Sequence, residues 1–218
     1  FAKETPEVSG DYPDPANPML RVRVFVHEPR RPVLSENLLC TDPDSQNVVD
    51  TTGWHLSSSI SYRLNLNNAP TDLVTIAELA FGTWQTAAND KVIFQRGADT
   101  SVSKSKLDYQ NVVAWNRTSG NALATTYTRY YPSTGLVADV DTIFNRRFPW
   151  GWSTVSCNPN YYDSLNVLTH EVGHWMGLDD EYTAGYLNNT MYGYADPGEI
   201  KKDTLTTGDS VNLPTIYP

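Results

Sequence analysis

Hydrophobic and polar residues alternate in several stretches of the chain, as they do in strands with one buried face. In residues 20–26 valines alternate with Arg21 and Arg23, and a second alternation runs through residues 60–66. Shorter apolar stretches predict the remaining strands, at residues 92–95, 111–115, 123–131 and 135–144. The pattern therefore predicts a chain rich in strands.

Two other stretches repeat apolar residues at intervals of three and four, which predicts amphipathic helices. The first covers residues 72–88, with Thr71 or Asp72 as its N-terminal cap. The second has Asp163 as its cap and ends at Gly177, because glycine accepts the left-handed turn that ends helices. Strands and helices together predict the α+β class.

The two ends of the chain have less pattern. Residues 1–18 are rich in proline and predict an extended arm, and residues 27–53 read as loop. A short terminal helix should begin near Thr207, and Pro214 must bend or end it.

Composition excludes two classes of partner. The 218 residues carry a net charge of −9 and a sequence pI of about 4.8, whereas a nucleic-acid-binding surface has to be basic. No apolar run approaches the roughly 18 residues of a membrane span. The content of 13 Tyr, 6 Trp and only 16 Lys+Arg is typical of secreted proteins. We expect a secreted monomer that binds neither nucleic acid nor membrane.

Two of the four histidines, His170 and His174, lie one helical turn apart on the second predicted helix. Two imidazole nitrogens on one face of a helix form half of a tetrahedral zinc site. Glu171, rotated by about 100° from His170, is placed to take a proton from water at the metal. The pattern His-Glu-x-x-His therefore predicts two zinc ligands and a general base.

The third ligand should follow the helix end. Gly177 lets the chain turn back, and Asp180 comes three residues later, which favours it over the adjacent Asp179. The fourth position would be left to water, as in a catalytic zinc site. In a thermolysin-like alternative the third ligand would be Glu199, which lies 25 residues after His174.

At these residues the chain resembles the metzincin zinc peptidases, whose motif is His-Glu-x-x-His-x-x-Gly-x-x-His/Asp followed by a methionine turn. Asp180 occupies the place of the third histidine, as in snapalysin-type bacterial secreted members. In Asn189-Thr190-Met191-Tyr192-Gly193, Met191 corresponds to the methionine under the ligands.

The wider likeness is closest to matrixins and covers about residues 54–218. The segments that carry it are 61–65, 80–84, 92–94, 122–126, 138–141 and 205–217. It implies a metzincin-type catalytic domain: a twisted mixed sheet, long helices, and a small lower subdomain at 178–218. Residues 1–53 would be an N-terminal extension or a pro-segment-like arm.

The resemblance implies a zinc endopeptidase that acts on protein or peptide substrates. Glu171 would act as the base, and an extended substrate would add to an edge strand by backbone hydrogen bonds. The substrate-binding residues would be Leu123, Ala124 and Thr125 on that strand, and Tyr192, Gly193 and Tyr194 in the wall of the pocket. The runner-up is a latent or inactive zinc-binding module.

Cys40 and Cys157 allow two interpretations. In a secreted chain two cysteines usually pair, so we favour a disulfide. Alternatively, the sequence around Cys40 is similar to the matrixin latency motif, in which a thiolate occupies the open zinc position.

Further metal sites have weaker signals. His27 and His55 are too few for a second, structural zinc site. Four acidic pairs could bind calcium, although solvated carboxylates are the favoured interpretation for each: Asp42 and Asp44, Asp139 and Asp141, Asp179 and Glu181, Asp196 and Glu199.

Overall fold

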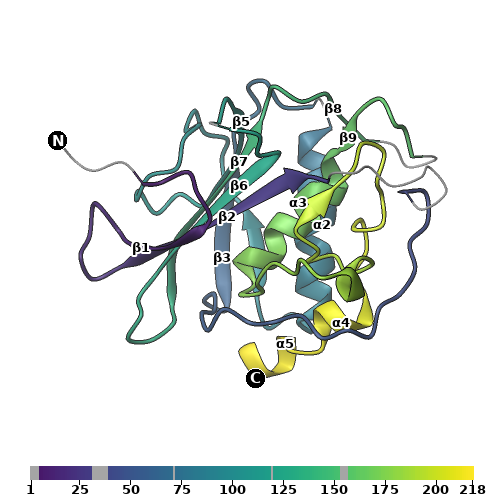
Figure 1. Ribbon diagram of the computed structural model, residues 1–218. Helices are drawn as coiled ribbons and strands as arrows, with labels where there is room; N and C mark the ends of the chain where they lie inside the picture. The colour runs from purple at the N-terminus through teal and green to yellow at the C-terminus, as the bar shows by residue number, and fades with distance from the viewer. Residues whose placement is uncertain (1–4, 31–38, 71, 119, 153–156) are drawn as a thin grey trace.

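The computed structural model describes residues 5–30, 39–70, 72–118, 120–152 and 157–218. Its main feature is a twisted mixed sheet with two main helices on one face (Figure 1). The strands are β1 (Gly10–Pro13), β2 (Arg21–Pro29), β3 (Ser59–Leu64), β4 (Ile93–Arg96), β5 (Val112–Asn116), β6 (Ala124–Tyr130), β7 (Val137–Asn145), β8 (Trp150–Gly151), β9 (Tyr162–Asp163) and β10 (Tyr194–Ala195). The helices are α2 (Leu73–Ala87), α3 (Ser164–Trp175), the 3-10 turn η1 (Ala184–Tyr186), α4 (Thr207–Ser210) and α5 (Leu213–Ile216). The predicted α+β class is confirmed.

The strand order in the large sheet is β1-β2-β6-β7-β5-β3-β4, and β10 also pairs with β2. β3, β4, β5 and β7 run parallel where they pair, whereas β2, β6 and β7 form an antiparallel set. The strands predicted from the alternation pattern are therefore present, and they share one sheet. The separate ladder of β8 and β9 lies just before α3.

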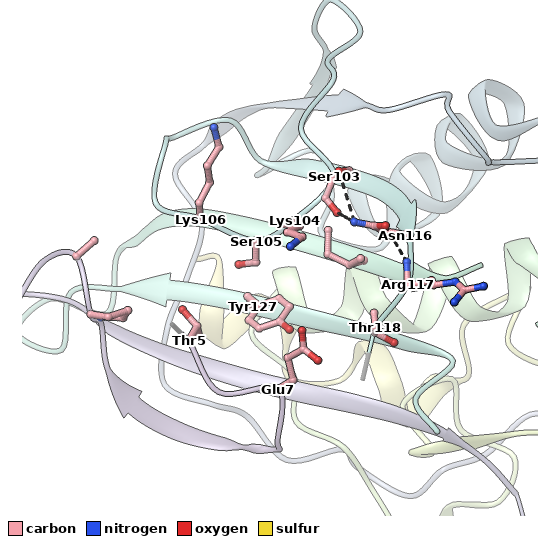
Figure 2. Close-up of a pocket in the computed structure, with 13 residues that line it drawn as sticks. Thr5, Glu7, Ser103, Lys104, Ser105, Lys106, Asn116, Arg117, Thr118 and Tyr127 are labelled. Atoms are coloured by element: carbon pink, nitrogen blue, oxygen red, sulfur yellow. Dashed lines mark hydrogen bonds between the residues drawn. The ribbon is translucent and has the colours of Figure 1, made fainter. Parts of the chain in front are cut away.

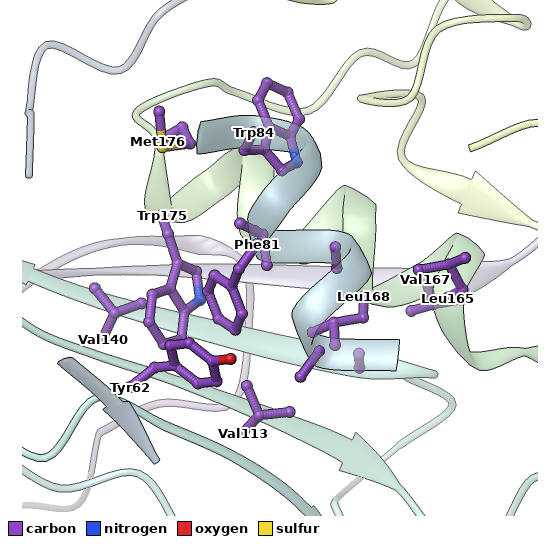
Figure 3. Packing of buried hydrophobic residues seen from close by; sticks show 14 of the residues in the cluster. Tyr62, Phe81, Trp84, Val113, Val140, Leu165, Val167, Leu168, Trp175 and Met176 are labelled. Carbon is purple, nitrogen blue, oxygen red and sulfur yellow. The ribbon is translucent and has the colours of Figure 1, made fainter. Parts of the chain in front are cut away.

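The core lies between the helices and the sheet. Aromatic side chains from α2, α3 and the sheet interlock there, with Phe81 stacked on Tyr62 at 4.1 Å between ring centroids and edge-on to Trp175 at 5.1 Å (Figure 3). The indole nitrogen of Trp84 on α2 donates to the Thr169 carbonyl of α3 at 2.7 Å. This packing fixes α3, the helix with the histidine motif, against the sheet.

The helix ends follow the sequence rules in part. Asp163 caps α3 by accepting from the N–H groups of Leu165 and Asn166, and Gly177 has the left-handed φ of +92° that was predicted. Of the two predicted caps, Asp72 is at the N-cap position of α2 but its side chain makes no capping hydrogen bond, and Thr71 is outside the described residues.

The predicted terminal helix is two short helices. α4 begins at Thr207, as expected, and a capping box between Thr206 and Asp209 stabilises its N-terminus. α5 begins after Asn212 with Pro214 in its first turn. Backbone N–H groups in the first turn have no partner within the helix, so proline fits there.

The N-terminal segment is part of the sheet. β2 extends to Pro29 and pairs with β1 and β6, so the loop expected from residue 27 begins later. The expectation that residues 123–126 form a sheet edge is wrong in this structure, because β2 pairs with that strand along the expected edge. A strand with one apolar face, as in Val22 and Val24, is stabilised by joining a sheet that buries this face.

Cys40 and Cys157 form the predicted disulfide, with their Cα atoms 5.5 Å apart. Cys40 is therefore not a free latency thiol. The bridge closes a sequence separation of 117 residues and ties the segment before β3 to the segment before α3.

Replacing both cysteines by serine should lower the free energy of unfolding by about 2–5 kcal/mol, because the unfolded chain gains the entropy of the opened loop. Urea unfolding with and without reductant measures this. Reduction should shift the midpoint of the parent chain and leave that of the double variant unchanged. Equal midpoints for the parent and the double variant would contradict a stabilising bridge.

A buried ion cluster links the neighbouring strands β6 and β7 with Asp14, the residue after β1. The Arg129 guanidinium lies 3.0 Å from Asp14, 2.9 Å from Asp139 and 3.2 Å from Asp141, and all four side chains are almost fully buried. Burial raises the pKa of Asp139 to about 6 against the pull of Arg129, and burial together with Asp139 raises that of Asp141 to about 8. The expectation of solvated carboxylates is wrong for this pair, and also for Asp196 and Glu199, which are 1% and 0% exposed.

The stability of the fold should therefore fall between pH 5 and pH 8. The folded chain holds protons on these carboxyls that the unfolded chain has already lost above about pH 4, so their contribution disappears as pH rises through 6 and 8. The midpoint of urea unfolding at pH 5, 6.5 and 8 measures the slope. Asp141→Asn should reduce it. Buried Asp203 and Glu171, whose pKa values are raised to about 8 and about 7, act in the same direction, and His170, whose pKa is lowered to about 4, opposes them below about pH 6.5. A midpoint that rises with pH would contradict this.

Candidate metal centre

The histidine motif is buried on α3, on the side that faces β2 and the C-terminal segment. His170 and His174 are fully buried and lie one turn apart, with ring centroids separated by 4.8 Å. Asp180 joins them from beyond the helix end: its Oδ1 is 3.2 Å from His170 Nε2 and 3.5 Å from His174 Nε2. Asp180 Oδ1 therefore lies close to both histidines that were predicted as ligands.

Backbone carbonyls determine which imidazole nitrogens face Asp180. His170 Nδ1 lies 2.8 Å from the Thr190 carbonyl oxygen, and His174 Nδ1 lies 3.0 Å from that of Leu178. A carbonyl accepts only, so each Nδ1 carries the proton and each Nε2 keeps its lone pair. This is the tautomer and orientation that a metal-binding histidine requires.

The turn after α3 brings Asp180 back to the helix. Gly177 begins this turn with its positive φ, and its carbonyl accepts from the Thr52 N–H at 2.9 Å. The second oxygen of Asp180, Oδ2, accepts from the Tyr182 hydroxyl at 3.0 Å, which leaves Oδ1 toward the histidines. Asp179, the alternative ligand, points away and pairs with Arg23 at 3.1 Å.

These residues fit a divalent metal. His170 Nε2, His174 Nε2 and Asp180 Oδ1 are all buried and have no hydrogen-bond partner, although each is of a type that seeks one. Imidazole nitrogen and carboxylate oxygen are ligands that zinc takes. Without a metal, burial lowers the pKa of His170 to about 4, while burial of Asp180 is outweighed by the two imidazoles, which hold its pKa well below the usual value.

A fourth potential ligand comes from β2, and the sequence analysis did not find it. His27, His170 and Asp180 each offer one ligand atom, all within 4.8 Å of one another, and so could hold a metal ion; His174 is not in this group and is linked to it through Asp180. The His27 ring centroid is 4.0 Å from that of His170. His27 lies far from His170 in the sequence. Only a prediction that placed β2 beside α3 could have revealed it as a potential ligand.

Glu171 faces β6 and is held by a chain of hydroxyl groups. Its Oε2 accepts from the Thr126 hydroxyl at 2.5 Å, Thr126 lies 2.6 Å from the Thr142 hydroxyl, and Thr142 accepts from the Trp175 indole at 2.9 Å. Because Thr126 donates its one hydroxyl proton to Glu171, the Thr142 hydroxyl donates to Thr126 and accepts from the indole. The other carboxylate oxygen, Oε1, is buried without a partner.

Burial raises the pKa of Glu171 to about 7, although the His174 ring and the Thr126 hydrogen bond pull it down. A carboxyl group with a pKa near 7 can both take and return a proton at neutral pH. Sequence reasoning found Glu171 but missed Thr126 and Thr142, which are separated from it by 45 and 29 positions.

Met191 lies under the helix, as the motif predicts. It is fully buried, and its side chain is so close to Gly173 that a β-carbon there would overlap the sulfur atom. The turn is held by Asp209, whose carboxylate accepts from the N–H groups of Thr190 at 2.9 Å and Met191 at 3.2 Å. Asp209 thereby positions the Thr190 carbonyl that orients His170.

The predicted substrate-binding residues lie on two sides of the candidate centre. Leu123, Ala124 and Thr125 are at the start of β6, and Tyr192, Gly193 and Tyr194 follow Met191 and lead into β10. Buried Lys202 supports the second side, since its Nζ donates to the carbonyls of Tyr192 at 2.5 Å and Tyr194 at 2.8 Å. Glu199 lies 3.8 Å from Lys202 and is not among the grouped ligand atoms.

The acidic pairs considered for calcium have other partners. Asp42 and Asp44 accept hydrogen bonds from Thr204 and Thr207, at 2.6 Å and 2.7 Å. Asp196 pairs with Arg30 at 3.1 Å. Within the described ranges, none of these carboxylates belongs to the group that could hold a metal.

A separate cavity of about 320 Å³ lies on the opposite face of the sheet (Figure 2). Thr126 of β6 points to Glu171, so its neighbour Tyr127 points away from α3 and lines this cavity together with Glu7 and Lys104. The cavity therefore has no access to the histidines.

The chain matches no protein-family model and no curated protein sequence. The likeness to metzincins therefore depends on the motif residues themselves. The part of the chain that the structure describes contains no helix long and apolar enough to cross a membrane.

Proposed function

We propose that this protein is a zinc-dependent endopeptidase of the metzincin type, with His170, His174 and Asp180 as metal ligands and Glu171 as the base. The observation that carries the proposal is the convergence of three buried, unpartnered ligand atoms beside a carboxylate whose Oε1 is also unpartnered. A structural zinc site would need no base beside the metal, which favours catalysis over a binding module.

When bound, a zinc ion supplies a Lewis acid and lowers the pKa of a coordinated water. Glu171 takes the proton of the attacking water on Oε1, while Thr126 holds Oε2 in place. Glu171 then gives that proton to the leaving amine nitrogen. Its pKa of about 7 suits both steps near neutral pH.

The substrate class that fits is an extended polypeptide. In this structure the strand β2 already pairs with the start of β6 on one side and with Tyr194 and Ala195 on the other, so these backbone groups accept an extended segment. A strand-like segment bound between them is held mainly by main-chain hydrogen bonds, which accept many sequences. The disulfide is consistent with a secreted protein, because such bonds persist in oxidising compartments.

Digestion of casein by the zinc-loaded chain tests the proposal. The whole chain and its His27→Ala variant are used, because His27 lies against the ligands. Mass spectrometry should find new internal termini, 1,10-phenanthroline should stop their formation, and added zinc should restore it. Failure of both chains to cleave casein at full zinc occupancy would contradict an endopeptidase.

A further inference from the structure

The side of the metal centre that a substrate would occupy is covered by the chain's own strand β2 (Figure 1). Residues 21–27 of β2 pair antiparallel with β6, and residues 28–29 pair parallel with β10. At the start of β6, the Leu123 N–H donates to the His27 carbonyl at 2.7 Å. The backbone groups on both sides of the proposed cleft are thus already paired with an extended peptide.

Alternate side chains of β2 point at the zinc motif. The Phe25 ring stacks on the His174 ring, with centroids 3.7 Å apart and planes within 7° of parallel. Two residues later, as the pleat requires, His27 lies 4.0 Å from the ring of His170. Both rings are about 1% exposed, so solvent is excluded from this side of the centre.

His27 has a nitrogen that no hydrogen bond uses. Its Nε2 lies 3.4 Å from Lys202 Nζ, whereas its Nδ1 is buried without a partner. A buried imidazole nitrogen without a partner is costly, and a metal beside it removes that cost. One His27 nitrogen lies within 4.8 Å of the ligand atoms of His170 and Asp180.

We propose that His27 is a fourth protein ligand of the metal, and that β2 occupies the substrate cleft, so that this conformation of the chain is latent. The inference rests on the proposed function, since it assigns the open position of that same centre. A catalytic zinc keeps one position for water or substrate, and a protein imidazole in that position excludes both. A substrate reaches β6 only when β2 leaves, and loss of the bond between His27 and the metal in His27→Ala should favour that release.

The outer face of β2 provides a matched control. Val22 and Val24 pack with Val112, Ala114 and Tyr127, so a change in β2 also affects stability, and stability alone does not test the proposal. Glu28 is exposed and next to His27, on the opposite face of the strand. Glu28→Gln therefore changes the same strand without touching the centre.

The experiment uses cobalt(II) in place of zinc and acetohydroxamate, a small metal chelator, as the probe. Visible absorption of the bound cobalt is recorded while acetohydroxamate is added to the parent, His27→Ala, His27→Gln and Glu28→Gln chains. His27→Gln keeps most of the side-chain volume and serves if the alanine variant does not fold. Asp180→Asn identifies the cobalt as bound at this centre.

Acetohydroxamate should change the cobalt spectrum of the parent only weakly, whereas the His27 variants should bind it at least about tenfold more tightly. A tenfold difference means that the cleft is open in at most about a tenth of the parent molecules. Glu28→Gln should behave as the parent. The His27 variants should also have a different cobalt spectrum before the probe is added, because one nitrogen ligand is replaced.

Equal spectra and equal acetohydroxamate affinities in the parent and both His27 variants would overturn the inference. Cleavage of casein by the parent would then leave the proposed function standing. Conversely, the predicted cobalt results without casein cleavage by any chain would support His27 as a ligand and reject the endopeptidase. Cobalt binding that Asp180→Asn does not weaken would overturn both.

Discussion

Glu171→Gln is expected to lower the rate of casein hydrolysis by about 10²–10⁴-fold, the usual contribution of a positioned proton-transfer group. The amide has nearly the shape of the carboxylate and can still accept from the Thr126 hydroxyl, so the local packing should persist. What it loses is the ability to take a proton on the oxygen that has no partner.

The measurement compares initial rates at equal zinc content, in the parent and in the His27→Ala background, so that access to the cleft does not limit the comparison. Thr126→Val serves as an intermediate variant. It removes the hydrogen bond that lowers the pKa of Glu171, and should displace the pH profile of hydrolysis upward rather than abolish it. Unchanged rates in Glu171→Gln would exclude Glu171 as the base.

Asp180→Asn is expected to weaken zinc binding by more than about 100-fold, because loss of an outer-shell partner alone costs 10–100-fold and Asp180 is a ligand. The neighbouring Asp179→Asn should leave zinc affinity nearly unchanged, since Asp179 pairs with Arg23 at the surface. Titration against a competing chelator of known affinity measures both constants.

The matched pair separates direct ligation from general electrostatics, because both variants remove one negative charge from adjacent positions. Urea unfolding of the metal-free chains controls for folding. If Asp179→Asn weakened zinc binding as much as Asp180→Asn, the assignment of the third ligand from the Gly177 turn would be wrong. If Glu199→Gln alone weakened it, the thermolysin-like arrangement would replace this one.

The geometry of the histidine motif was predictable because its information is local. One helical turn sets the positions of His170 and His174, and the glycine after the helix sets the position of Asp180. The Asp163 cap and the strand alternation are also short-range signals. For these features the spacing along the sequence determines the geometry.

The contributions of distant segments were not predictable in the same way. His27 reaches the centre only because β2 joins the sheet beside β6, and the pairing partner of a strand is not encoded in its own alternation. The hydroxyl chain through Thr126 and Thr142 depends on strand register, and the Asp209 support of the Met191 turn depends on how the terminal helices pack. Asp139 and Asp141 were predicted to be solvated for the same reason, because their partner Arg129 is on a different strand.

The most direct test of the central claim is to locate the zinc. Crystals of the whole chain grown with one equivalent of zinc, measured on both sides of the zinc absorption edge, give an anomalous map that identifies the metal without assumptions about the fold. We predict one strong peak about 2 Å from His170 Nε2, His174 Nε2 and an oxygen of Asp180, with a His27 nitrogen in the fourth position and Glu171 outside that distance. A peak elsewhere, or none at these three residues, would contradict this prediction.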